Sequence, residues 1–429
     1  MSRQTPPPLL GQLHYAWIIV FSGILTLFCC MGLGRFALGM LLPSMGDSLD
    51  LSYSQMGFIS TGNFIGYLLA VFFCGKMITR FGERITIVTG LVLISVSMLM
   101  VSQSTTLSLI ILLYFITGIG SAAANITAMT LIAHWFSQKY RGRAAGYMII
   151  GNGLGIVISG ILIPWLNSHW SDTGWRIGWA AFGITIAVVA VIVALLIRNS
   201  PNDLACQPFG ENTGKQRIPE AHISDRKRSK LIAHIGAIYF VFGFTYVIYT
   251  TFIVTTLVEQ YAFSEAKAGM LWMAIGIVSV MSGVLFGWVS DHFGRKKGLM
   301  TVYGIQTTSY LLVASNLGDT ALFISMMLFG LTAFSIPAII AAMISDMLPP
   351  SEAGKVFGYV TFFFGVGQIG GPSIAGYLAE QSGSFTSSYL LAGLSTAVGI
   401  ILTMALKSTQ QQPEPLSSSI APSPIKQVD

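Results

Sequence analysis

Long runs of apolar residues alternate with short polar connections along most of this chain. A helix needs about 20 apolar residues to cross a hydrocarbon core of about 30 Å. Twelve runs come close to that length or exceed it, and they cover residues 16–43, 53–74, 85–102, 107–132, 144–166, 175–197, 231–257, 267–290, 298–315, 320–345, 356–379 and 386–406. The pattern predicts an all-α membrane protein with twelve transmembrane helices.

One connection is much longer than the others. Residues 199–230, "NSPNDLACQPFGENTGKQRIPEAHISDRKRSK", are polar and charged, and they divide the twelve runs into six and six. We therefore expect an N-terminal six-helix bundle over residues 1–198, a central loop over 199–230 and a C-terminal six-helix bundle over 231–407. The Pro-, Ser- and Gln-rich tail over 408–429 has the composition of a disordered segment.

The composition supports a membrane protein and argues against an enzyme or a metal site. The chain is 53% hydrophobic and only 9% charged, whereas soluble domains carry about 25% charged residues. Its four cysteines form no C-x-x-C pair and no metal-ligand spacing, so we expect no cofactor. The first apolar run is longer than the roughly 7–15 residues of a signal-peptide core, which predicts a retained span. The runs contain no acid–base pair or nucleophile–histidine arrangement typical of a catalytic site.

The net charge of +6 is explained by membrane topology. Lys and Arg are retained on the cytoplasmic side of membrane proteins. With the N-terminus inside, the inside segments hold Arg3, Lys76, Arg80, Arg84, Lys139, Arg141, Arg143, Arg198, Lys215, Arg217, Arg226, Lys227, Arg228, Lys230, Arg295, Lys296, Lys297, Lys355, Lys407 and Lys426. The outside segments hold only Arg176 and Lys267. We expect a plasma-membrane protein (inner membrane in bacteria) with both termini cytoplasmic, contacts with anionic lipid and no nucleic-acid partner.

Two of the short connections resemble each other. "GKMITRFGER" begins at Gly75, and "GWVSDHFGRK" begins at Gly287. We call the separation of these two glycines the repeat offset. The same offset pairs Gly57 with Gly269, Gly118 with Gly330, Gly142 with Gly354, Gly146-Tyr147 with Gly358-Tyr359, Gly153 with Gly365 and Gly155 with Gly367. The two halves are therefore predicted to be parallel repeats that pack their six helices in the same way.

Six plus six helices, a long inside loop and a G-x-x-x-D-x-x-G-R-K-type connection in both halves resemble the major facilitator superfamily over about residues 14–407. The resemblance implies two bundles around a central cavity, with the substrate near the bilayer midplane and alternating access by rocking of one bundle against the other.

The connections are candidate conformational latches. The resemblance implies that the motif's aspartate, present as Asp291 but replaced by Thr79 in the first half, helps to lock the inside ends of the two bundles. We expect Gly75 and Gly287 to allow close helix contact, and Gly82 and Gly294 to form tight turns. The latch set is Gly75, Gly82, Arg84, Gly287, Asp291, Gly294 and Arg295. Retention of positive charge on the inside remains the alternative for its basic members.

Arg35 is the one Lys or Arg well inside an apolar run, since Arg176 and Lys267 lie at the ends of theirs. It lies about 9 Å outward of the middle of its helix at a rise of about 1.5 Å per residue, and a charge at mid-membrane costs roughly 2.5–3.5 kcal/mol. It could snorkel to the outer head groups or form a structural pair, or it could face the cavity and hold an anion. The surrounding Gly32, Gly34 and Gly39 leave room beside the guanidinium, which favours the anion site.

No Asp, Glu or His lies at mid-membrane depth in the runs, so no proton relay is evident.

Polar residues at helical spacing suggest which helix faces line the path of the substrate. They are Asn63 and Tyr67 with Ser60 in the second run, Asn125 with Ser121 in the fourth, Tyr246 and Tyr249 with Tyr239 and Phe242 in the seventh, and Gln368 in the eleventh. The predicted substrate-binding set is Arg35, Asn63, Tyr67, Asn125, Tyr246, Tyr249 and Gln368. Interhelical hydrogen bonds of about 0.6 kcal/mol are the alternative role of such polar residues, and packing is the alternative for the tyrosines.

A second resemblance concerns the substrate. "HWFSQKYRGRAAG", residues 134–146, is similar to a loop of monocarboxylate and oxalate–formate type carriers, which implies a small organic anion. In monocarboxylate carriers the arginine that holds the anion is usually on helix 8, yet the run 267–290 contains no arginine. Arg35 would then hold the anion from the other bundle. "GLGRFALGMLLP", around Arg35, resembles a bacterial branch of the superfamily.

The sequence therefore predicts a monomeric secondary active transporter that binds a small organic anion and contacts the lipid bilayer along its apolar faces. Two alternatives stay open. An exporter of amphipathic or drug-like compounds would use the many Met, Phe and Tyr side chains as an adaptable surface. A non-transporting membrane sensor or scaffold is the other.

The predicted topology is testable at Cys206, the one cysteine in a loop. An impermeant maleimide should label Cys206 in inside-out vesicles and leave it unlabelled in intact cells, because the central loop is expected to be cytoplasmic. Labelling in intact cells would overturn the predicted orientation.

Overall fold

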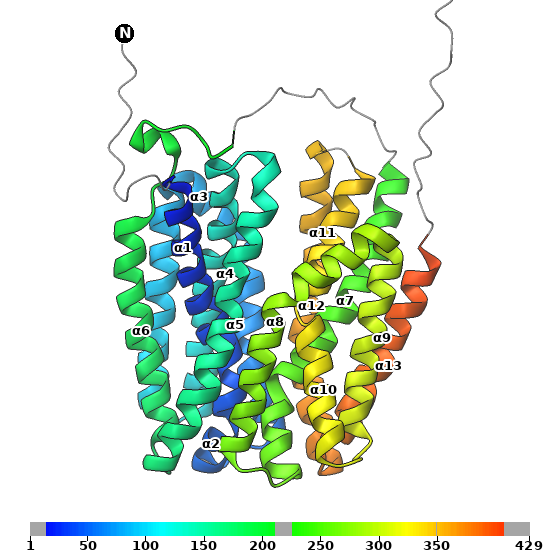
Figure 1. The fold of residues 1–429 in the computed structure, drawn as a ribbon. Helices are drawn as coiled ribbons and strands as arrows, with labels where there is room; N and C mark the ends of the chain where they lie inside the picture. The colour runs from blue at the N-terminus through cyan, green and yellow to red at the C-terminus, as the bar shows by residue number, and fades with distance from the viewer. Residues whose placement is uncertain (1–13, 211–224, 349, 407–429) are drawn as a thin grey trace, which may run out of the picture.

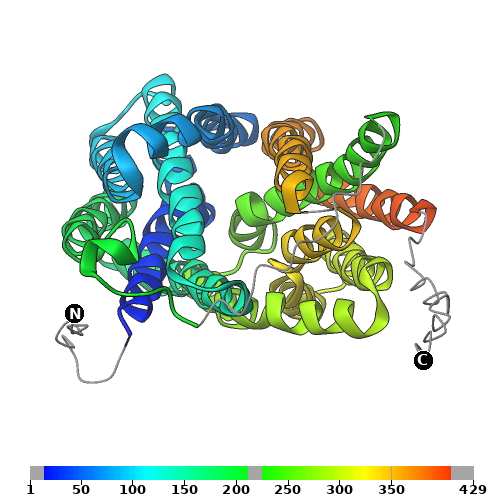
Figure 2. The ribbon, with the colours of Figure 1, turned by 90° about the horizontal axis from the view of Figure 1, so that it is seen from above.

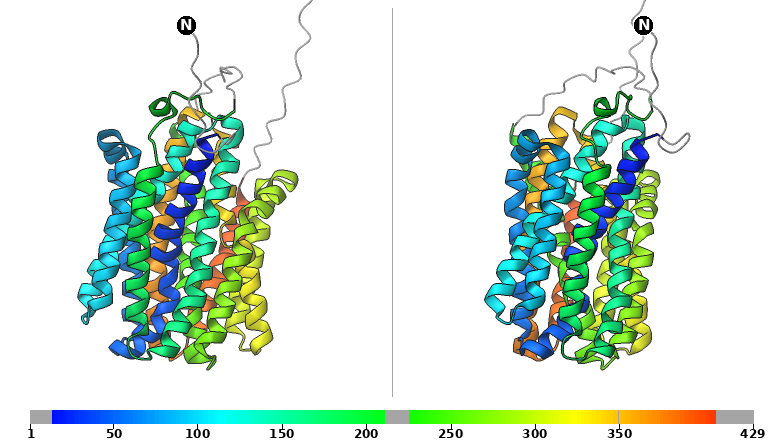
Figure 3. Two further views of the ribbon diagram at one scale, coloured as in Figure 1. Left: turned by 60° about the vertical axis from the view of Figure 1, so that its left-hand side comes forward. Right: turned by 90° about the vertical axis from the view of Figure 1, so that its left-hand side faces the viewer.

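The structure is a computed structural model that describes residues 14–210, 225–348 and 350–406. The predicted tail over 408–429 and part of the predicted central loop lie outside these ranges. The helices run in one common direction and form two bundles that lie side by side (Figures 1 and 2). Two further views show the same common direction of the helices (Figure 3).

The N-terminal bundle is built from five long helical stretches. They are α1 (Ala16–Leu27) continuing through the π-helix η1 (Phe28–Phe36) into α2 (Ala37–Leu49), then α3 (Tyr53–Gln103), α4 (Leu107–Trp135), α5 (Gln138–His169) and α6 (Gly174–Leu196). α3 has 51 residues, with a non-helical φ of 79° and ψ of 167° at Gly82. A membrane span takes about 20 residues of helix, so α3 crosses the membrane once on each side of Gly82. The bundle therefore has six crossings.

The C-terminal bundle follows the short helix η2 (Pro201–Leu204). It consists of α7 (Asp225–Thr255) with η3 (Thr256–Gln260), α8 (Glu265–Phe293), α9 (Arg295–Ala314), α10 (Asp319–Thr332) with α11 (Ser335–Met347), α12 (Pro350–Ser382) and α13 (Thr386–Ala405). Nine stretches of the described chain are long and apolar enough to span a membrane. One of them is α3, which crosses twice, and α9 and α12 complete the twelve crossings that the sequence predicts.

The structure departs from the predicted runs in three places. The runs 53–74 and 85–102 belong to one helical stretch turned at Gly82, α7 begins at Asp225, and the run 320–345 is interrupted between α10 and α11. At this interruption Ser282 of α8 replaces the lost helical bonds, because its hydroxyl accepts from the Phe334 N–H at 2.9 Å and its carbonyl accepts from the Ser335 hydroxyl at 2.9 Å. A buried break of this kind needs such a partner, and local sequence does not reveal it.

Glycines bring the two bundles into backbone contact. A side chain at Gly57 of α3 would overlap the Pro372 carbonyl of α12, and a side chain at Gly269 of α8 would overlap the Gly160 carbonyl of α5. Gly57 and Gly269 are separated by the repeat offset, as are Gly160 and Pro372. The interface between the bundles therefore follows the repeat, and small residues allow its close approach as in other membrane helix pairs.

The bundles are joined by hydrogen bonds at one end of the molecule. Glu380 of α12 accepts from the Ser52 hydroxyl at 2.9 Å and from the Ser54 N–H at 3.1 Å. Asn167 of α5 donates to Glu265 of α8 at 2.6 Å. We call this the closed end.

The opposite end, where α1 begins and α13 finishes, is rich in basic residues. It carries Lys76, Arg84, Arg141, Arg295 and Lys296, so we call it the basic end. There the two bundles diverge (Figure 1).

Cys206 is half-buried beside η2. Its thiol donates to the Pro201 carbonyl at 3.4 Å, and burial raises the pKa of the thiol. The thiolate is the form that reacts with maleimide. Labelling of Cys206 should therefore be slow near neutral pH and should quicken as the pH rises, so topology experiments need matched pH on both sides of the membrane.

Gly269→Ala should force the closed end apart, because its added methyl group would overlap the Gly160 carbonyl. Spin labels at the exposed positions Asp172 and Gln381 would report the separation at that end. We expect the variant to lengthen the distance between the labels. The matched control is Gly287→Ala at the basic end, where no atom lies within 4 Å of an added Cβ. An unchanged distance in Gly269→Ala would contradict the tight packing assigned to this contact.

Candidate functional site

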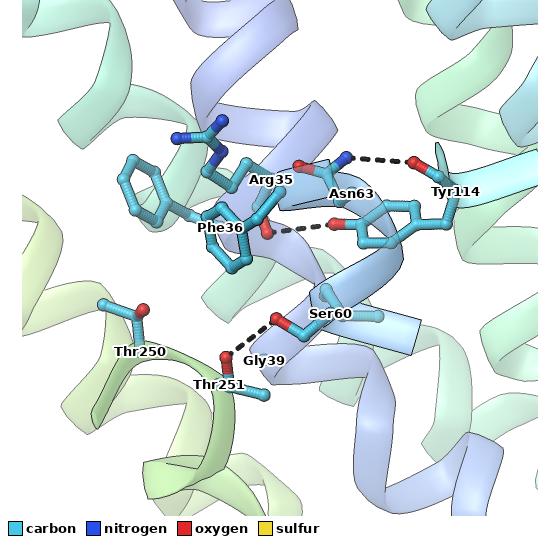
Figure 4. Close-up of a pocket in the computed structure, with 10 residues that line it drawn as sticks. Arg35, Phe36, Gly39, Ser60, Asn63, Tyr114, Thr250 and Thr251 are labelled. Carbon is cyan, nitrogen blue, oxygen red and sulfur yellow. Dashed lines mark hydrogen bonds between the residues drawn. The ribbon is translucent and has the colours of Figure 1, made fainter. Parts of the chain in front are cut away.

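Arg35 is buried at the middle of the molecule. It is 9% exposed, and its guanidinium lies over the rings of Tyr67 at 4.4 Å and Phe64 at 4.8 Å, both on α3. A cation over two aromatic faces is stabilised by the ring quadrupoles, by about 2 kcal/mol or more for a desolvated contact. Figure 4 shows the guanidinium directed away from the hydrogen bond that joins Ser60 to Thr251. The side chain thus packs on aromatic rings inside the protein.

The helix that carries Arg35 is wider than an α-helix. Residues Phe28–Phe36 form a π-helix, a conformation that is rare and concentrated at functional sites. Two hydroxyls of α4 donate to its carbonyl groups, Ser121 to Cys30 at 3.0 Å and Tyr114 to Arg35 at 3.2 Å. These bonds satisfy backbone groups that an irregular helix pairs poorly, and they fix the position of the Arg35 backbone.

Two amides hold the tyrosine hydroxyls near Arg35. Asn125 of α4 donates to the Tyr67 hydroxyl at 2.9 Å, and Gln368 of α12 donates to the Tyr246 hydroxyl of α7 at 2.5 Å. The Tyr246 hydroxyl also lies close enough to the guanidinium to interact with it. A phenol that accepts from an amide keeps its own O–H free to donate. The site therefore presents hydrogen-bond donors from both bundles.

The charge of Arg35 is not neutralised by a described residue. Its Nε and Nη2 atoms are buried without a hydrogen-bond partner, and no carboxylate of the described residues forms an ion pair with it. A buried charge is normally paired or bound to a ligand. The arrangement of a cation and free hydroxyl donors is suited chemically to an anion.

The other predicted residues lie at different distances from this centre. Asn63 adjoins Arg35 in a small cavity, where it donates to the Tyr114 carbonyl at 3.2 Å and its Oδ1 has no partner (Figure 4). Tyr249 lies inside the C-terminal bundle, bonded to Ser325 of α10 at 2.8 Å and stacked on Phe329 at 4.0 Å. The structure therefore places Tyr249 apart and brings together Arg35, Tyr67, Asn125, Tyr246 and Gln368, with Asn63 beside them.

Two aromatic residues at the site are absent from the predicted set. Phe64 lies three residues before Tyr67 and Phe364 lies four residues before Gln368, which places each on the same helix face as a predicted residue. Phe64 lies under Arg35, and Phe364 stacks on Tyr239 at 4.5 Å and on Tyr246 at 5.8 Å. The spacing is the available signal, although an apolar ring in a membrane helix usually indicates packing alone.

The latch connections form equivalent contacts in the two halves. Gly82 and Gly294 both have positive φ, 79° and 93°. Arg84 donates to the Ala194 carbonyl at the end of α6 at 2.7 Å, and Lys296 donates to the Leu406 carbonyl after α13 at 3.0 Å. Lys296 follows Arg84 by the repeat offset, and Leu406 follows Ala194 by the same offset. The repeat is therefore preserved in individual bonds as well as in glycine positions.

In one equivalent contact the acidic and the basic residue are exchanged between the halves. In the C-terminal half Arg295 pairs with Asp346 at 2.7 Å and with Asp291, which precedes it on the chain. The positions that precede Arg295 and Asp346 by the repeat offset are Glu83 and His134, and these two side chains form a contact of 3.2 Å. Acid and base have thus exchanged places between the halves.

The expected close contacts at two latch glycines are absent from this conformation. No atom lies within 4 Å of a Cβ added at Gly75 or Gly287, because the bundles are apart at the basic end. Asp291 pairs with Arg295 of its own bundle and forms no ion pair with the described part of the other bundle. Thr79 donates to the Gly75 and Lys76 carbonyls of its own helix, each at 3.1 Å.

The twelve-span fold in two repeated bundles is that of a major facilitator superfamily transporter, and comparison with known proteins agrees. Residues 27–404 match the family described as "Uncharacterised MFS-type transporter YbfB", and the chain belongs to that family. It is a multi-pass integral membrane transporter, and its family and relatives are transporters, not enzymes.

Relatives with named substrates are distant in sequence but cover most of the chain. The hexuronate transporter of Bacillus subtilis (strain 168) is 23% identical over 84% of this chain and 87% of its own. Monocarboxylate transporter 12 of Xenopus laevis is 22% identical over 99% and 95%. Among solved structures, the nucleoside transporter NupG superposes with a TM-score of 0.70 at 14% identity, covering 92% of this chain and 99% of NupG. The structural likeness supports the fold.

The reversed pair can be tested by exchanging its charges. Glu83→Arg should lower the melting temperature of the purified protein by several degrees, because an arginine would then face His134, and a broken pair with a buried member costs about 0.5–3 kcal/mol. Adding His134→Asp should recover most of the loss by recreating the Arg295–Asp346 arrangement. A double variant no more stable than Glu83→Arg would show that the two contacts are not equivalent.

Proposed function

We propose that this transporter carries a small organic anion, a carboxylate, by alternating access around Arg35. The observation that carries the proposal is the unpaired edge of the guanidinium. Nε and Nη2 are the two nitrogens without a partner, and together they form the side of an arginine that donates two parallel hydrogen bonds to one carboxylate. The free hydroxyl hydrogens of Tyr67 and Tyr246 supply further donors.

The donors come from both bundles, which suits a transported ligand. Arg35, Tyr67 and Asn125 belong to the N-terminal bundle, whereas Tyr246 and Gln368 belong to the C-terminal bundle. An anion bound between them would be held by two bodies that move relative to each other. Substrate sites at the interface of two repeats, near the bilayer midplane, are the arrangement on which alternating access depends.

We assign the basic end to the cytoplasm on the distribution of Lys and Arg. Both termini are then cytoplasmic, in the plasma membrane (the inner membrane in bacteria), and the conformation is open toward the inside. The bonds of Glu380 to Ser52 and Ser54, and of Asn167 to Glu265, would form the outer closure.

The latch residues belong to the opposite state. When the outer closure opens, the basic ends of the two bundles would approach each other. The open space beside Gly75 and Gly287 would then be filled by neighbouring helices, and Asp291 would come within reach of the other bundle.

The relatives support a carboxylate. Besides the hexuronate and monocarboxylate transporters, the 4-hydroxybenzoate transporter PcaK of Acinetobacter baylyi is 22% identical over 92% of this chain and 93% of its own. Hexuronates and 4-hydroxybenzoate differ in shape but share a carboxylate. The protein called Multidrug resistance protein 2 of Bacillus subtilis, 26% identical over 91% of this chain and 95% of its own, favours the exporter alternative.

Substitution of Arg35 tests the proposal. Arg35→Ala should abolish binding of glucuronate, lactate and 4-hydroxybenzoate by the purified protein. The substitution removes both the positive charge and the planar fork of N–H donors that the guanidinium offers to a carboxylate. Arg35→Lys keeps the charge and loses the fork. For each of these anions that the wild type binds, the affinity should therefore fall severalfold or more. Equilibrium binding would be measured by calorimetry, with transport checked in proteoliposomes.

The matched control is Arg143→Ala, which removes an exposed arginine at the basic end. It should leave anion affinity unchanged. The uncharged 4-hydroxybenzamide should bind much more weakly than 4-hydroxybenzoate in the wild type. If the amide and the acid bind alike, or if Arg35→Ala keeps normal affinity for the acid, the exporter alternative takes precedence.

A further inference from the structure

Aromatic rings from both bundles lie near Arg35. Phe64 and Tyr67 of α3 lie under its guanidinium. In the C-terminal bundle, Phe364 of α12 lies close to Tyr239 and Tyr246 of α7, at ring-centroid distances of 4.5 Å and 5.8 Å and interplanar angles of 16° and 7°. The rings on the C-terminal side therefore have nearly parallel planes. Such alignment presents flat faces in one orientation.

Only some of these rings have free surface. Phe64, Tyr239 and Tyr246 are buried, at 4%, 3% and 5% exposed. Tyr67 and Phe364 are half-buried. One belongs to each bundle, so the partly exposed rings near Arg35 are divided between the two bundles.

The two accessible rings come from helices that touch. The residue after Tyr67 is Leu68 and the residue after Phe364 is Gly365. A Cβ added at Gly365 would lie 2.7 Å from the Leu68 side chain, so α3 and α12 meet directly beside both rings. Tyr67 also lies under the Arg35 charge, at 4.4 Å from its ring centre. Ring surface and cation thus adjoin one another.

We infer that the transported anion carries an aromatic ring as well as its carboxylate. The inference rests on the proposed function, in which the carboxylate binds Nε and Nη2 of Arg35. The ring then lies against Tyr67 and Phe364. Offset-stacked and edge-to-face contacts between rings add attraction beyond the burial of area, and flat partners recognise a flat ligand better than a puckered one of the same size.

Benzoate and cyclohexanecarboxylate provide a matched pair of probes. Both carry one carboxylate on a six-membered carbon ring, and they differ in aromaticity. We expect the wild-type protein to bind benzoate roughly fivefold or more tightly, given the usual strength of aromatic pairs. Phe364→Leu should bring the two affinities within about twofold by weakening benzoate alone, whereas Phe364→Tyr keeps a ring and should preserve the difference.

The possible outcomes distinguish a failure of the aromatic inference from a failure of the proposed carboxylate site. If the wild type binds both acids within twofold and Phe364→Leu changes neither affinity, the aromatic inference is wrong and the carboxylate site stands. If neither acid binds while glucuronate or lactate does and requires Arg35, the inference is again wrong and the proposed function stands. If no carboxylate in either set binds, both proposals fall. Preserved wild-type preference in Phe364→Leu, with Phe364→Tyr folded equally well, would remove Phe364 from the ring site.

Discussion

A buried arginine without a carboxylate partner is the constraint around which the centre of this protein is organised. The arginine side chain is a cation, and the described residues form no ion pair with Arg35. The rings of Phe64 and Tyr67 stabilise the cation without neutralising it, and the hydroxyls of Ser121 and Tyr114 hold the π-helix from which it projects. A carboxylate beside the guanidinium would stabilise the empty protein more strongly, but it would compete with any anion. The aromatic partners leave Nε and Nη2 of the guanidinium without a hydrogen-bond partner.

Movement requires a different pattern of contacts between the bundles. Within each bundle, large side chains interdigitate, as Tyr249 does with Phe329 and Tyr310. Between the bundles, glycines meet backbone carbonyls at Gly57 and Gly269, and a few hydrogen bonds join the closed end. Flat backbone surfaces can separate without unlocking interdigitated side chains. The interface is therefore close at these glycines, and ring pairs such as Tyr53 with Phe385, 4.7 Å apart, also cross it.

The fold is predictable from the sequence, and the site is predictable in part. Apolar runs of span length and a constant repeat offset are strong signals because lipid and gene duplication both impose them over many residues. Arg35 stands out because a charge in an apolar run costs free energy. The π-helix leaves no comparable mark, since it depends on hydroxyls from α4. Tyr249 follows Tyr246 at helical spacing, yet its hydroxyl bonds to Ser325 inside the C-terminal bundle, a contact that spacing along one helix does not reveal. Phe364 escapes prediction because rings are ordinary in membrane helices.

The exchanged acid and base at Glu83–His134 and Arg295–Asp346 bear on how the two halves diverged. Halves that descend from one duplicated segment began with the same pair at both places. Whichever substitution came first, the changing pair passed through a stage in which its two side chains did not match in charge. A protein that kept its fold through that stage would not have depended on attraction at this contact. Both halves keep a side-chain contact at this place, although the acidic and the basic residue have exchanged positions.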